Sequence, residues 1–304
     1  MMSSQQQSLS TTAHVRGDTP PSQLAAPVPR DWVRTELPDT WPDRRPNGRP
    51  LSLLQVIRHA LFRRRQPVAL PEDMPGGDRI PRYVLQEFHG VPNGNYSNRI
   101  TRGYVTGFEI SMLGEMGRVR RLLVNQLRDC RRVIDVGCGS ARNAAAVLNA
   151  GVSEVWGLDI SPYMLRHAAS DHEGVRLLQG LAEDIPAPDQ YFDGAAVVFL
   201  LHEMPPRSVC QALDELARVL CPGGKLVVAE PSPLQMQLSG WQLWRCHGWR
   251  GLYFRRLMHS VHEPFLKAWH RMDFADEARR RGFEVLEEQC GVPIRSWVMQ
   301  RKTC

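Results

Sequence analysis

The sequence has no uninterrupted apolar run of about 18 residues, so it predicts no transmembrane helix. Its first residues also contain no apolar core of the kind found in secretory signals. The seven cysteines are an odd number and form no Cys-x-x-Cys pair, which disfavours both a disulfide framework and a structural zinc site. We therefore expect a reduced, cytoplasmic protein without a metal centre.

Lysine is scarce as well. The only lysines are Lys225, Lys267 and Lys302, so the net charge of +6, from 38 basic and 32 acidic residues, comes almost entirely from arginine. An excess of this size is not the clustered basic stripe that is typical of nucleic-acid-binding proteins. We therefore expect no nucleic-acid partner, and the composition indicates no particular oligomeric state.

The chain divides into three regions of different composition. Residues 1–50 are rich in Ser, Gln, Pro and Arg without apolar periodicity, which predicts a disordered leader. Residues 51–110 hold a basic amphipathic helix over Leu51–Arg65, a Pro- and Gly-rich linker over Pro71–Pro81, and an N-terminal cap. The helix could dock on the main domain, which we favour, or lie on a membrane surface. Residues 111–304 are expected to form the principal domain.

The most informative stretch is Val133–Ala141, where an apolar strand leads into two closely spaced glycines and a helix-forming run. Gly137 and Gly139 allow a sharp turn and a close approach of the backbone to a ligand, which the N–H groups of the next helix would face. A second apolar strand ends in Asp159, whose carboxylate can accept both hydroxyls of a ribose. A dinucleotide site expects a third glycine where Arg142 stands, so a nicotinamide-dependent oxidoreductase is disfavoured.

Several segments resemble the class I S-adenosylmethionine-dependent methyltransferases. The family's first motif, an acidic residue followed by glycines, is matched by Asp135, Gly137, Gly139 and Ala141, with alanine in place of the third glycine. That replacement matters if position 141 needs a positive φ. The later motifs are matched, in the family's order and spacing, by three segments: Asp159–Leu165, Gly180–Pro186 and Arg218–Gly224.

The resemblance implies an α/β fold of the Rossmann-like methyltransferase type. Its three layers would be built on a doubly wound, mostly parallel seven-stranded sheet, with a C-terminal antiparallel hairpin formed by residues 282–287 and 294–300. The resemblance also implies S-adenosyl-L-methionine as the cofactor, with Asp159 on the ribose and Ile160 or Met164 over the adenine. The full set of residues implied at the cofactor is Asp135, Gly137, Gly139, Ala141, Asp159, Ile160, Met164, Ala182, Glu183 and Phe199.

Polar residues outside these motifs indicate where a methyl acceptor would bind. His202 and Glu203 follow the fourth strand, and open parallel sheets bind ligands beyond the carboxyl ends of their strands. A histidine there could take a proton from the acceptor, or it could only close the loop by hydrogen bonding. The N-terminal cap adds His89, Asn95 and Tyr96 as candidate substrate contacts.

Residues 232–270 form an insertion that is too aromatic for a simple loop. Trp241 and Trp244, which lie among several arginines, are further candidate substrate contacts. Three interpretations stay open: a lid over an aromatic or prenylated acceptor, a membrane-surface element that reaches an acceptor dissolved in lipid, and ordinary hydrophobic cover. The placement of the insertion resembles that in the ubiquinone and menaquinone methyltransferase branch.

The sequence therefore predicts an enzyme that transfers a methyl group from S-adenosylmethionine to a small, aromatic or amphipathic molecule. One alternative is a quinone- or lipid-ring-modifying enzyme in peripheral contact with a membrane. A second alternative is a non-catalytic S-adenosylmethionine-binding protein. A sulfonium is already a strong leaving group, so alignment of the acceptor supplies much of the acceleration, and a base is needed mainly for a phenol, an enol or a ring carbon.

Overall fold

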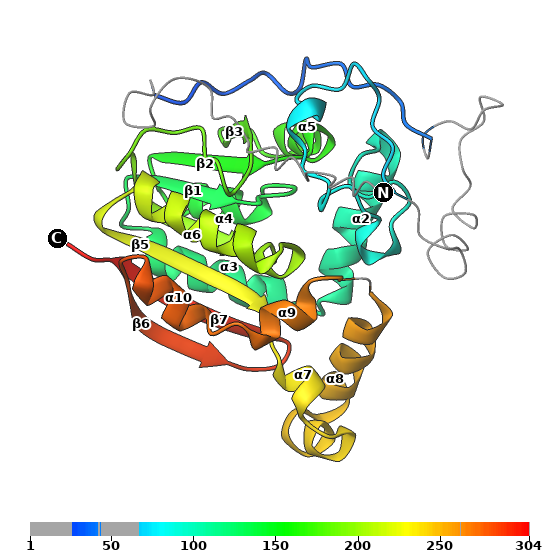
Figure 1. Cartoon of the computed structure of the whole chain (residues 1–304), viewed down its shortest axis with the longest axis vertical. Coiled ribbons are helices and arrows are strands. Elements are labelled where there is room, and N and C mark those ends of the chain that lie inside the picture. The colour runs from blue at the N-terminus through cyan, green and yellow to red at the C-terminus, as the bar shows by residue number, and fades with distance from the viewer. Residues whose placement is uncertain (1–25, 42, 44–66, 262, 304) are drawn as a thin grey trace, which may run out of the picture.

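The computed structural model describes residues 26–41, 43, 67–261 and 263–303. Its centre is a seven-stranded sheet with the strand order β3-β2-β1-β4-β5-β7-β6 (Figure 1). The strands are β1 (Arg132–Val136), β2 (Glu154–Asp159), β3 (Arg176–Gln179), β4 (Phe192–Val198), β5 (Leu220–Pro231), β6 (Phe283–Cys290) and β7 (Ile294–Arg301). The pairs from β3 to β5 are parallel, whereas β7 pairs antiparallel with both β5 and β6. The predicted mostly parallel sheet with a C-terminal antiparallel hairpin is confirmed.

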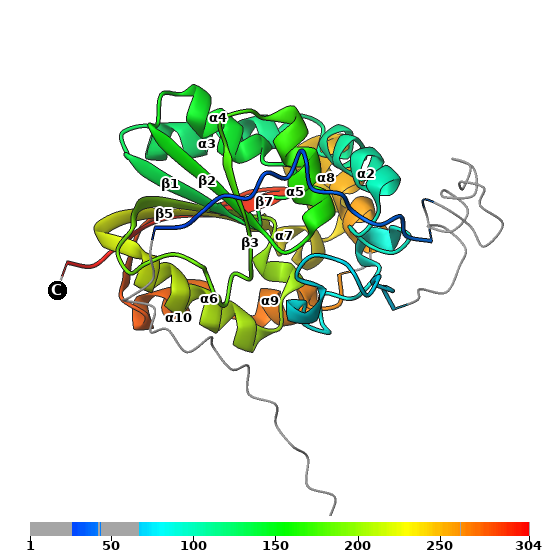
Figure 2. The ribbon, with the colours of Figure 1, turned by 90° about the horizontal axis from the view of Figure 1, so that it is seen from above.

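Helices cover both faces of this sheet, which confirms the three predicted layers (Figure 2). One face carries α3 (Glu115–Leu127), α4 (Arg142–Asn149) and α5 (Pro162–Asp171). The other face carries α6 (Pro206–Val219), α9 (Leu266–Arg271) and α10 (Phe274–Arg280). The remaining helices are α2 (Asn98–Ser111), α7 (Leu234–Gln237), α8 (Gly240–Ser260) and the short 3-10 turns η2 (Gly77–Arg79), η3 (Phe88–Gly90) and η4 (Leu201–Glu203).

The central strands are buried on both sides because each face of the sheet is covered. In β1, Ile134 packs into the core on the α6 side, while its neighbour Val133 packs into the core on the α3 side. Such strands read as continuous apolar runs rather than as an alternation of apolar and polar residues. This is why β1 and β4 were recognisable in the sequence.

Local capping signals explain where several helices begin. The Ser161 hydroxyl accepts the N–H of Met164, and Pro162 occupies the first position of α5, as the sequence predicts. At the start of α8, Ser239 and Gln242 form a reciprocal capping box. Gly248, with φ of 60° and ψ of −153°, then interrupts α8 and divides it into two helical segments.

Part of the predicted disordered leader is folded. Residues 26–41 run along the end of the sheet beyond β3 (Figure 1). Trp32 is 2% exposed, and its indole N–H donates to the Leu177 carbonyl of β3 at 3.2 Å. The Tyr163 hydroxyl of α5 donates to the Pro38 carbonyl at 2.7 Å. The prediction of disorder is therefore wrong for residues 26–41, because a few buried anchors fix a segment whose composition is otherwise polar.

Asp43 ties the same region to α2. Its carboxylate accepts the Ser97 hydroxyl at 2.7 Å and the backbone N–H groups of Asn98 and Arg99 at 3.1 and 2.9 Å. These N–H groups belong to the first turn of α2, where an anion is favourable. Residues 1–25, 42 and 44–50 of the predicted leader, and the helix predicted over Leu51–Arg65, lie outside the described residues.

The predicted Pro- and Gly-rich linker is packed against the domain. Met74 and Ile80 are buried in a small cluster with Tyr96 and Tyr163. The side-chain amide of Gln179, at the end of β3, donates to the Pro75 carbonyl at 2.7 Å. Residues 71–81 therefore form part of the N-terminal cap. No helix within the described ranges combines the length and apolar character needed to cross a bilayer.

Candidate active site

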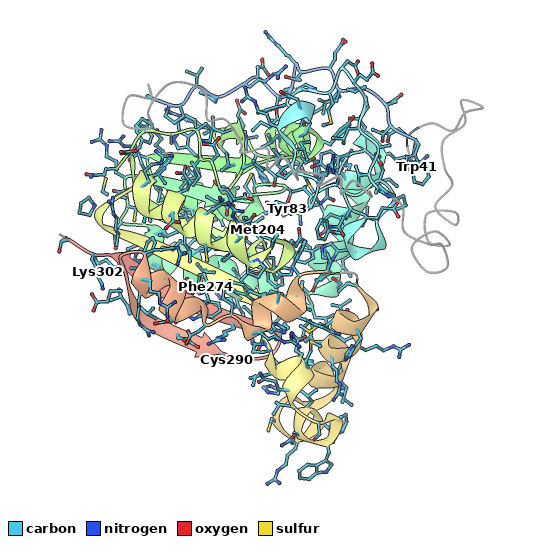
Figure 3. The ribbon with its side chains drawn as sticks, viewed as in Figure 1. Trp41, Tyr83, Met204, Phe274, Cys290 and Lys302 are labelled. Atoms are coloured by element: carbon cyan, nitrogen blue, oxygen red, sulfur yellow. The ribbon has the colours of Figure 1, made fainter. Side chains whose placement is uncertain are left out.

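A pocket lies at the carboxyl ends of β1, β2 and β4, the edge at which open parallel sheets bind ligands. Its volume is about 280 Å³. One side is formed by the loops after the strands, which contribute Gly137, Gly139 and Asp159. The other side is formed by the cap, α2 and α8. Figure 3 labels two of the lining residues, Tyr83 and Met204.

The turn after β1 has the backbone conformation that its glycines predict. Gly137 and Gly139 have φ values of 72° and 50°. A Cβ atom on Gly137 would lie 2.8 Å from the Leu200 side chain, whereas a Cβ on Gly139 would meet nothing within 4 Å. Ala141 precedes α4 with a φ of 57°, so an alanine holds the left-handed conformation that glycine adopts more easily. The replacement of the family's third glycine therefore carries a backbone cost.

Asp159 joins this turn to the start of α5. Its Oδ2 atom accepts the N–H of Gly139 and its Oδ1 atom accepts the N–H of Ser161, both at 2.8 Å. Burial raises the pKa of Asp159 to about 6, although these hydrogen bonds act in the opposite direction. The carboxylate lines the pocket, and each oxygen can accept a further hydrogen bond.

Asp135 and Ala141 lie beneath the pocket wall and not on it. The Oδ2 atom of Asp135 accepts the N–H of Ala144 at 3.2 Å, while its buried Oδ1 atom has no hydrogen-bond partner. Burial raises the pKa of Asp135 to about 7. The first motif thus places a nearly inaccessible carboxylate behind the turn.

The remaining residues implied at the cofactor all line the pocket, namely Ile160, Met164, Ala182, Glu183 and Phe199. Glu183 accepts the Tyr83 hydroxyl through Oε1 at 2.5 Å, and its buried Oε2 atom has no hydrogen-bond partner. Glu183 lines the pocket, and its buried oxygen without a partner is an acceptor that the N–H or O–H donor of a ligand could satisfy. Tyr83, which belongs to the cap, was not among the site residues predicted from the sequence.

His202 is held between two carboxylates at the end of β4. Its Nδ1 atom lies 2.6 Å from Glu230 Oε2, and its Nε2 atom lies 3.6 Å from Glu263 Oε1. Burial alone would lower the pKa of His202, but Glu230 and Glu263 raise it well above its ordinary value. An imidazolium donates from both nitrogens and accepts no proton, so this geometry favours a fixed cation over the general base considered from the sequence.

A second histidine completes this polar cluster. His89 Nε2 lies 2.8 Å from Glu203 Oε1, and His89 Nδ1 lies 3.7 Å from Glu263 Oε1. Glu263, located between α8 and α9, therefore stands between His89 and His202. Burial would raise the pKa of Glu263, but His202 and His89 lower it below its ordinary value. The carboxylate is therefore ionised at neutral pH.

A row of aromatic rings forms the wall beside this cluster. Tyr104 stacks on His89 with ring centroids 5.5 Å apart, and Phe108 follows at 6.3 Å. Phe108 meets the edge of Phe199 at 5.6 Å, and Phe199 meets His202 at 5.9 Å. These rings and the carboxylates of Glu203 and Glu263 border the same cavity as Asp159.

The candidate substrate residues divide into two groups. His89, Asn95 and Tyr96 line the pocket. Trp241 and Trp244 do not, because they stand on the part of α8 that projects away from the sheet and are 65% and 56% exposed (Figure 1). The lid interpretation is therefore wrong for these two tryptophans. The second half of α8 supplies the wall instead, through Phe254, Leu257 and Met258.

The sequence contains patterns that could have identified further residues in and behind the pocket. Glu230, which holds His202 from behind the pocket lining, is the last residue but one of the buried strand β5, much as Asp159 is the last residue of β2, so a similar strand-end pattern pointed to it. Tyr104 and Phe108 are one helical turn apart on α2, a helix that the sequence analysis did not predict separately. Glu263 follows α8 with no periodic pattern to mark it. In the part of the chain that the structure describes, no cluster of three or more His, Cys, Asp or Glu side chains could hold a metal ion.

Comparisons with known proteins agree with this geometry. Residues 134–228 match the family model described as "Methyltransferase domain". The chain is 31% identical over 175 residues to the demethylmenaquinone methyltransferase of Tropheryma whipplei, an alignment that covers 54% of this chain and 67% of that protein. The chain belongs to the class I S-adenosylmethionine-dependent methyltransferases. Its cofactor is S-adenosylmethionine.

The similarity extends to a further relative and to a solved structure, each over more than half of this chain. This methyltransferase is 29% identical over 201 residues to the demethylmenaquinone methyltransferase of Bacillus licheniformis, covering 64% of this chain and 81% of that protein. The solved structure of the PH0226 protein from Pyrococcus horikoshii is similar with a TM-score of 0.49 and 19% sequence identity, over 62% of this chain and 90% of that one.

The pocket of this methyltransferase fits a cationic cofactor by its charge. Its lining includes five carboxylates, from Glu109, Asp159, Glu183, Glu203 and Glu263, whereas Arg142 is the only lining arginine among the described residues. Glu109 is paired with Arg120 at 2.7 Å and with Arg142 at 3.8 Å. An excess of carboxylates lowers the electrostatic energy of a bound sulfonium or ammonium group.

Proposed function

We propose that this methyltransferase acts on a small aromatic ring that carries a hydroxyl group, of the naphthol or hydroquinone type. The observation that carries this proposal is the continuity of the pocket, which runs from Asp159 to the aromatic row of Tyr104, Phe108 and Phe199. Aromatic walls favour a planar ring through offset and edge-to-face contacts. Two of the relatives are named demethylmenaquinone methyltransferase, after a quinone, and reduction of a quinone gives a hydroquinone, which is a ring of the proposed kind.

The first half of the pocket suits the cofactor. We expect Asp159 to accept the ribose hydroxyls, Ile160 and Met164 to flank the adenine, and the unpartnered Oε2 atom of Glu183 to accept an amino donor. The open space above Gly139 would admit the ligand close to the backbone. When bound, S-adenosylmethionine supplies an electrophilic methyl group on a sulfonium.

The second half of the pocket suits removal of a proton from the acceptor. We propose that Glu203 accepts the hydroxyl proton of the acceptor. The acceptor's oxygen or adjacent ring carbon would then take the methyl group as the C–S bond of the sulfonium breaks and leaves a neutral thioether. If the ring carbon is methylated, its own hydrogen returns to the oxygen as the ring becomes aromatic again. Glu203 lines the pocket, and its contact with His89 occupies one of its two oxygens. His202, held as a cation by Glu230 and Glu263, offsets the negative charge of the cluster. Its role is to position Glu263, and the loop that carries Glu203, beside the acceptor.

Tyr104 illustrates why a local base is useful here. Burial, followed by the Glu203 and Glu263 carboxylates, raises the pKa of Tyr104 well above its ordinary value. A phenolic acceptor in the same surroundings would also resist ionisation before it reacts. Transfer of its proton to Glu203 during the reaction avoids a free phenolate in a negative cavity.

The test is a transfer assay with radiolabelled methyl donor on a panel of phenols, naphthols and hydroquinones, with amines and carboxylic acids as the contrasting acceptors. Glu203→Gln should lower kcat on a hydroxylated ring by about 10²- to 10⁴-fold. Binding of S-adenosylhomocysteine should remain within about twofold, because Glu203 belongs to the acceptor half of the pocket. Product analysis by mass spectrometry and NMR identifies whether oxygen or ring carbon carries the new methyl group.

Glu173→Gln is the matched control, because Glu173 is an exposed glutamate on the loop before β3. It should leave both kcat and cofactor binding unchanged. Turnover confined to amines or carboxylic acids would refute the proposed acceptor class. An unchanged kcat for Glu203→Gln on a phenolic acceptor would refute the assignment of the base.

A further inference from the structure

Exposed tryptophan is concentrated on α8. Trp241, Trp244 and Trp249 are 65%, 56% and 58% exposed, and Leu252 on the same helix is 38% exposed. The other large apolar side chains that are exposed among the described residues are Val28, Val33, Ile110 and Leu286, none of them aromatic. Trp241, Trp244, Trp249 and Leu252 form what we call the α8 patch. Its large apolar surface is too concentrated to be ordinary scatter.

The charged side chains of α8 are all basic. Gly240–Ser260 contains four arginines and neither Asp nor Glu. Arg250 is paired with Glu115 of α3 at 2.6 Å, and Arg255 donates to the Leu238 carbonyl at 3.0 Å. Arg245 and Arg256 are exposed, and Arg245 lies 5.2 Å from the ring of Trp241. The patch therefore combines apolar rings with positive charge.

The same helix connects the patch with the pocket. Its second segment is anchored on the end of α2, because the Tyr253 hydroxyl donates to the Ser111 carbonyl at 2.9 Å. Leu257 and Met258 of this segment line the pocket. The first segment, with α7, projects beyond the sheet (Figure 1). Trp249 and Leu252 of the patch therefore lie on the same helical segment as Leu257 and Met258 of the pocket wall.

We infer that the α8 patch docks on the surface of a bilayer that contains anionic lipids, and that the methyl acceptor enters the pocket from that bilayer. Tryptophan prefers the interface between water and lipid, where its ring is buried and its N–H remains hydrated. Arginine reaches the phosphate groups of anionic lipids from the same depth. A second copy of the chain fits less well, because a symmetric contact would bring Arg245 and Arg256 of both copies together.

This inference rests on the proposed function, since it identifies the acceptor as an amphipathic ring compound dissolved in lipid. The test uses the full chain with vesicles of phosphatidylcholine, with and without phosphatidylglycerol, measured by co-sedimentation. The wild-type protein should bind the anionic vesicles, and brominated lipids should quench its tryptophan fluorescence. The triple variant Trp241→Ala/Trp244→Ala/Trp249→Ala should lose binding by on the order of 100-fold. Arg245→Gln/Arg256→Gln should lose roughly 20- to 30-fold at low salt, about fivefold for each arginine.

Matched controls separate the patch from general effects of apolar or charged residues. Leu286→Ala/Val33→Ala removes exposed apolar side chains away from α8, and Arg34→Gln/Arg128→Gln removes exposed positive charge. Both should leave vesicle binding unchanged. The triple tryptophan variant should still bind S-adenosylhomocysteine and methylate a water-soluble acceptor at the wild-type rate, which separates failure of docking from failure of the proposed function.

Two results would overturn the inference. The first is that wild-type protein does not sediment with anionic vesicles at low ionic strength, although the same protein methylates a soluble acceptor. The other is a wild-type dimer in light scattering that becomes a monomer in the triple tryptophan variant, with no vesicle binding by either protein. That second result would assign the α8 patch to contact between two copies of the chain.

Discussion

Replacement of Asp159 by asparagine tests the centre of the cofactor site with almost no change in shape. The two carboxylate oxygens each accept a backbone N–H, from Gly139 and from Ser161. Asparagine has one oxygen and one NH₂ group, so one of these N–H donors would face another donor. The variant therefore loses a hydrogen bond as well as the negative charge that we expect the ribose hydroxyls to meet.

The size of the effect follows from these losses. A hydrogen bond to a charged group contributes about 1.5 to 3 kcal/mol, and the ligand's hydroxyls would lose at least one such bond. We expect Asp159→Asn to weaken binding of S-adenosylmethionine by about 10- to 150-fold. Asp159→Ala, which removes the acceptor completely, should weaken it further.

The pKa of Asp159 adds a pH dependence that the variant should lack. The pKa is about 6 in the free protein, and the ribose hydroxyls should bind the ionised carboxylate. Wild-type affinity should therefore be constant well above pH 6 and fall as the pH drops through 6, by up to about tenfold per pH unit. Asp159→Asn should have a flatter profile through this range.

Isothermal titration calorimetry with S-adenosylmethionine, S-adenosylhomocysteine and NADH provides the measurement. The first two ligands should bind the wild-type protein and NADH should not. Circular dichroism at each pH checks that the variant remains folded. Near-normal affinity of folded Asp159→Asn protein at pH 8 would refute the ribose assignment.

Two further predictions concern the glycine turn after β1 and Asp135, the strand residue behind it. Gly139→Ala should fold, with backbone strain of about 1 kcal/mol, but lose most cofactor affinity because its methyl group would occupy open space in the pocket lining. Gly151→Ala has the same open surroundings and a φ of 102°, which is farther from the left-handed region that alanine can adopt. It is the control that should melt no higher than Gly139→Ala and still bind normally in calorimetry. Asp135→Asn should raise the melting temperature of the free protein at pH 8 but not at pH 4, because burial raises the folded-state pKa of Asp135 from 3.8 to about 7. The contribution of this group to stability is therefore fully present below pH 4 and lost as the pH rises through 7, by about 4 kcal/mol at most. Equal melting temperatures of Asp135→Asn and wild type at pH 8 would contradict this reasoning.

The polar cluster around Glu263 suggests why cap, sheet and insertion have to fold together. His89 comes from the cap, His202 from the loop after β4, Glu230 from β5 and Glu263 from the segment after α8. A buried charge that loses its partner is costly, so removal of one member would leave an uncompensated charge on another. This arrangement couples the acceptor half of the pocket to the position of α8.

The local parts of the molecule were predictable because their signals are contiguous in the chain. The β1 strand, the glycine turn and the start of α4 lie within one short stretch, and hydrophobic runs mark the strands that are buried on both faces. The serine and proline that begin α5 act within one turn of helix. Asp159 was identifiable for the same reason, since it ends a buried strand of the sheet. The family resemblance then supplied the mostly parallel seven-stranded sheet and its C-terminal hairpin.

Only the tertiary structure decided which residues face the pocket and which face solvent. Trp241 and Trp244 belong to a segment whose aromatic content is typical of a lid. The direction in which α8 projects nevertheless places them outside the pocket. His202 has the ordinary features of a base until Glu230 and Glu263, from 28 and 61 residues further along the chain, enclose it. Trp32 and Pro38 fix part of a polar leader through contacts with β3 and α5. Burial and long-range charge pairs depend on segments that meet only when the chain has folded, whereas turns, caps and strand ends are determined by the sequence alone.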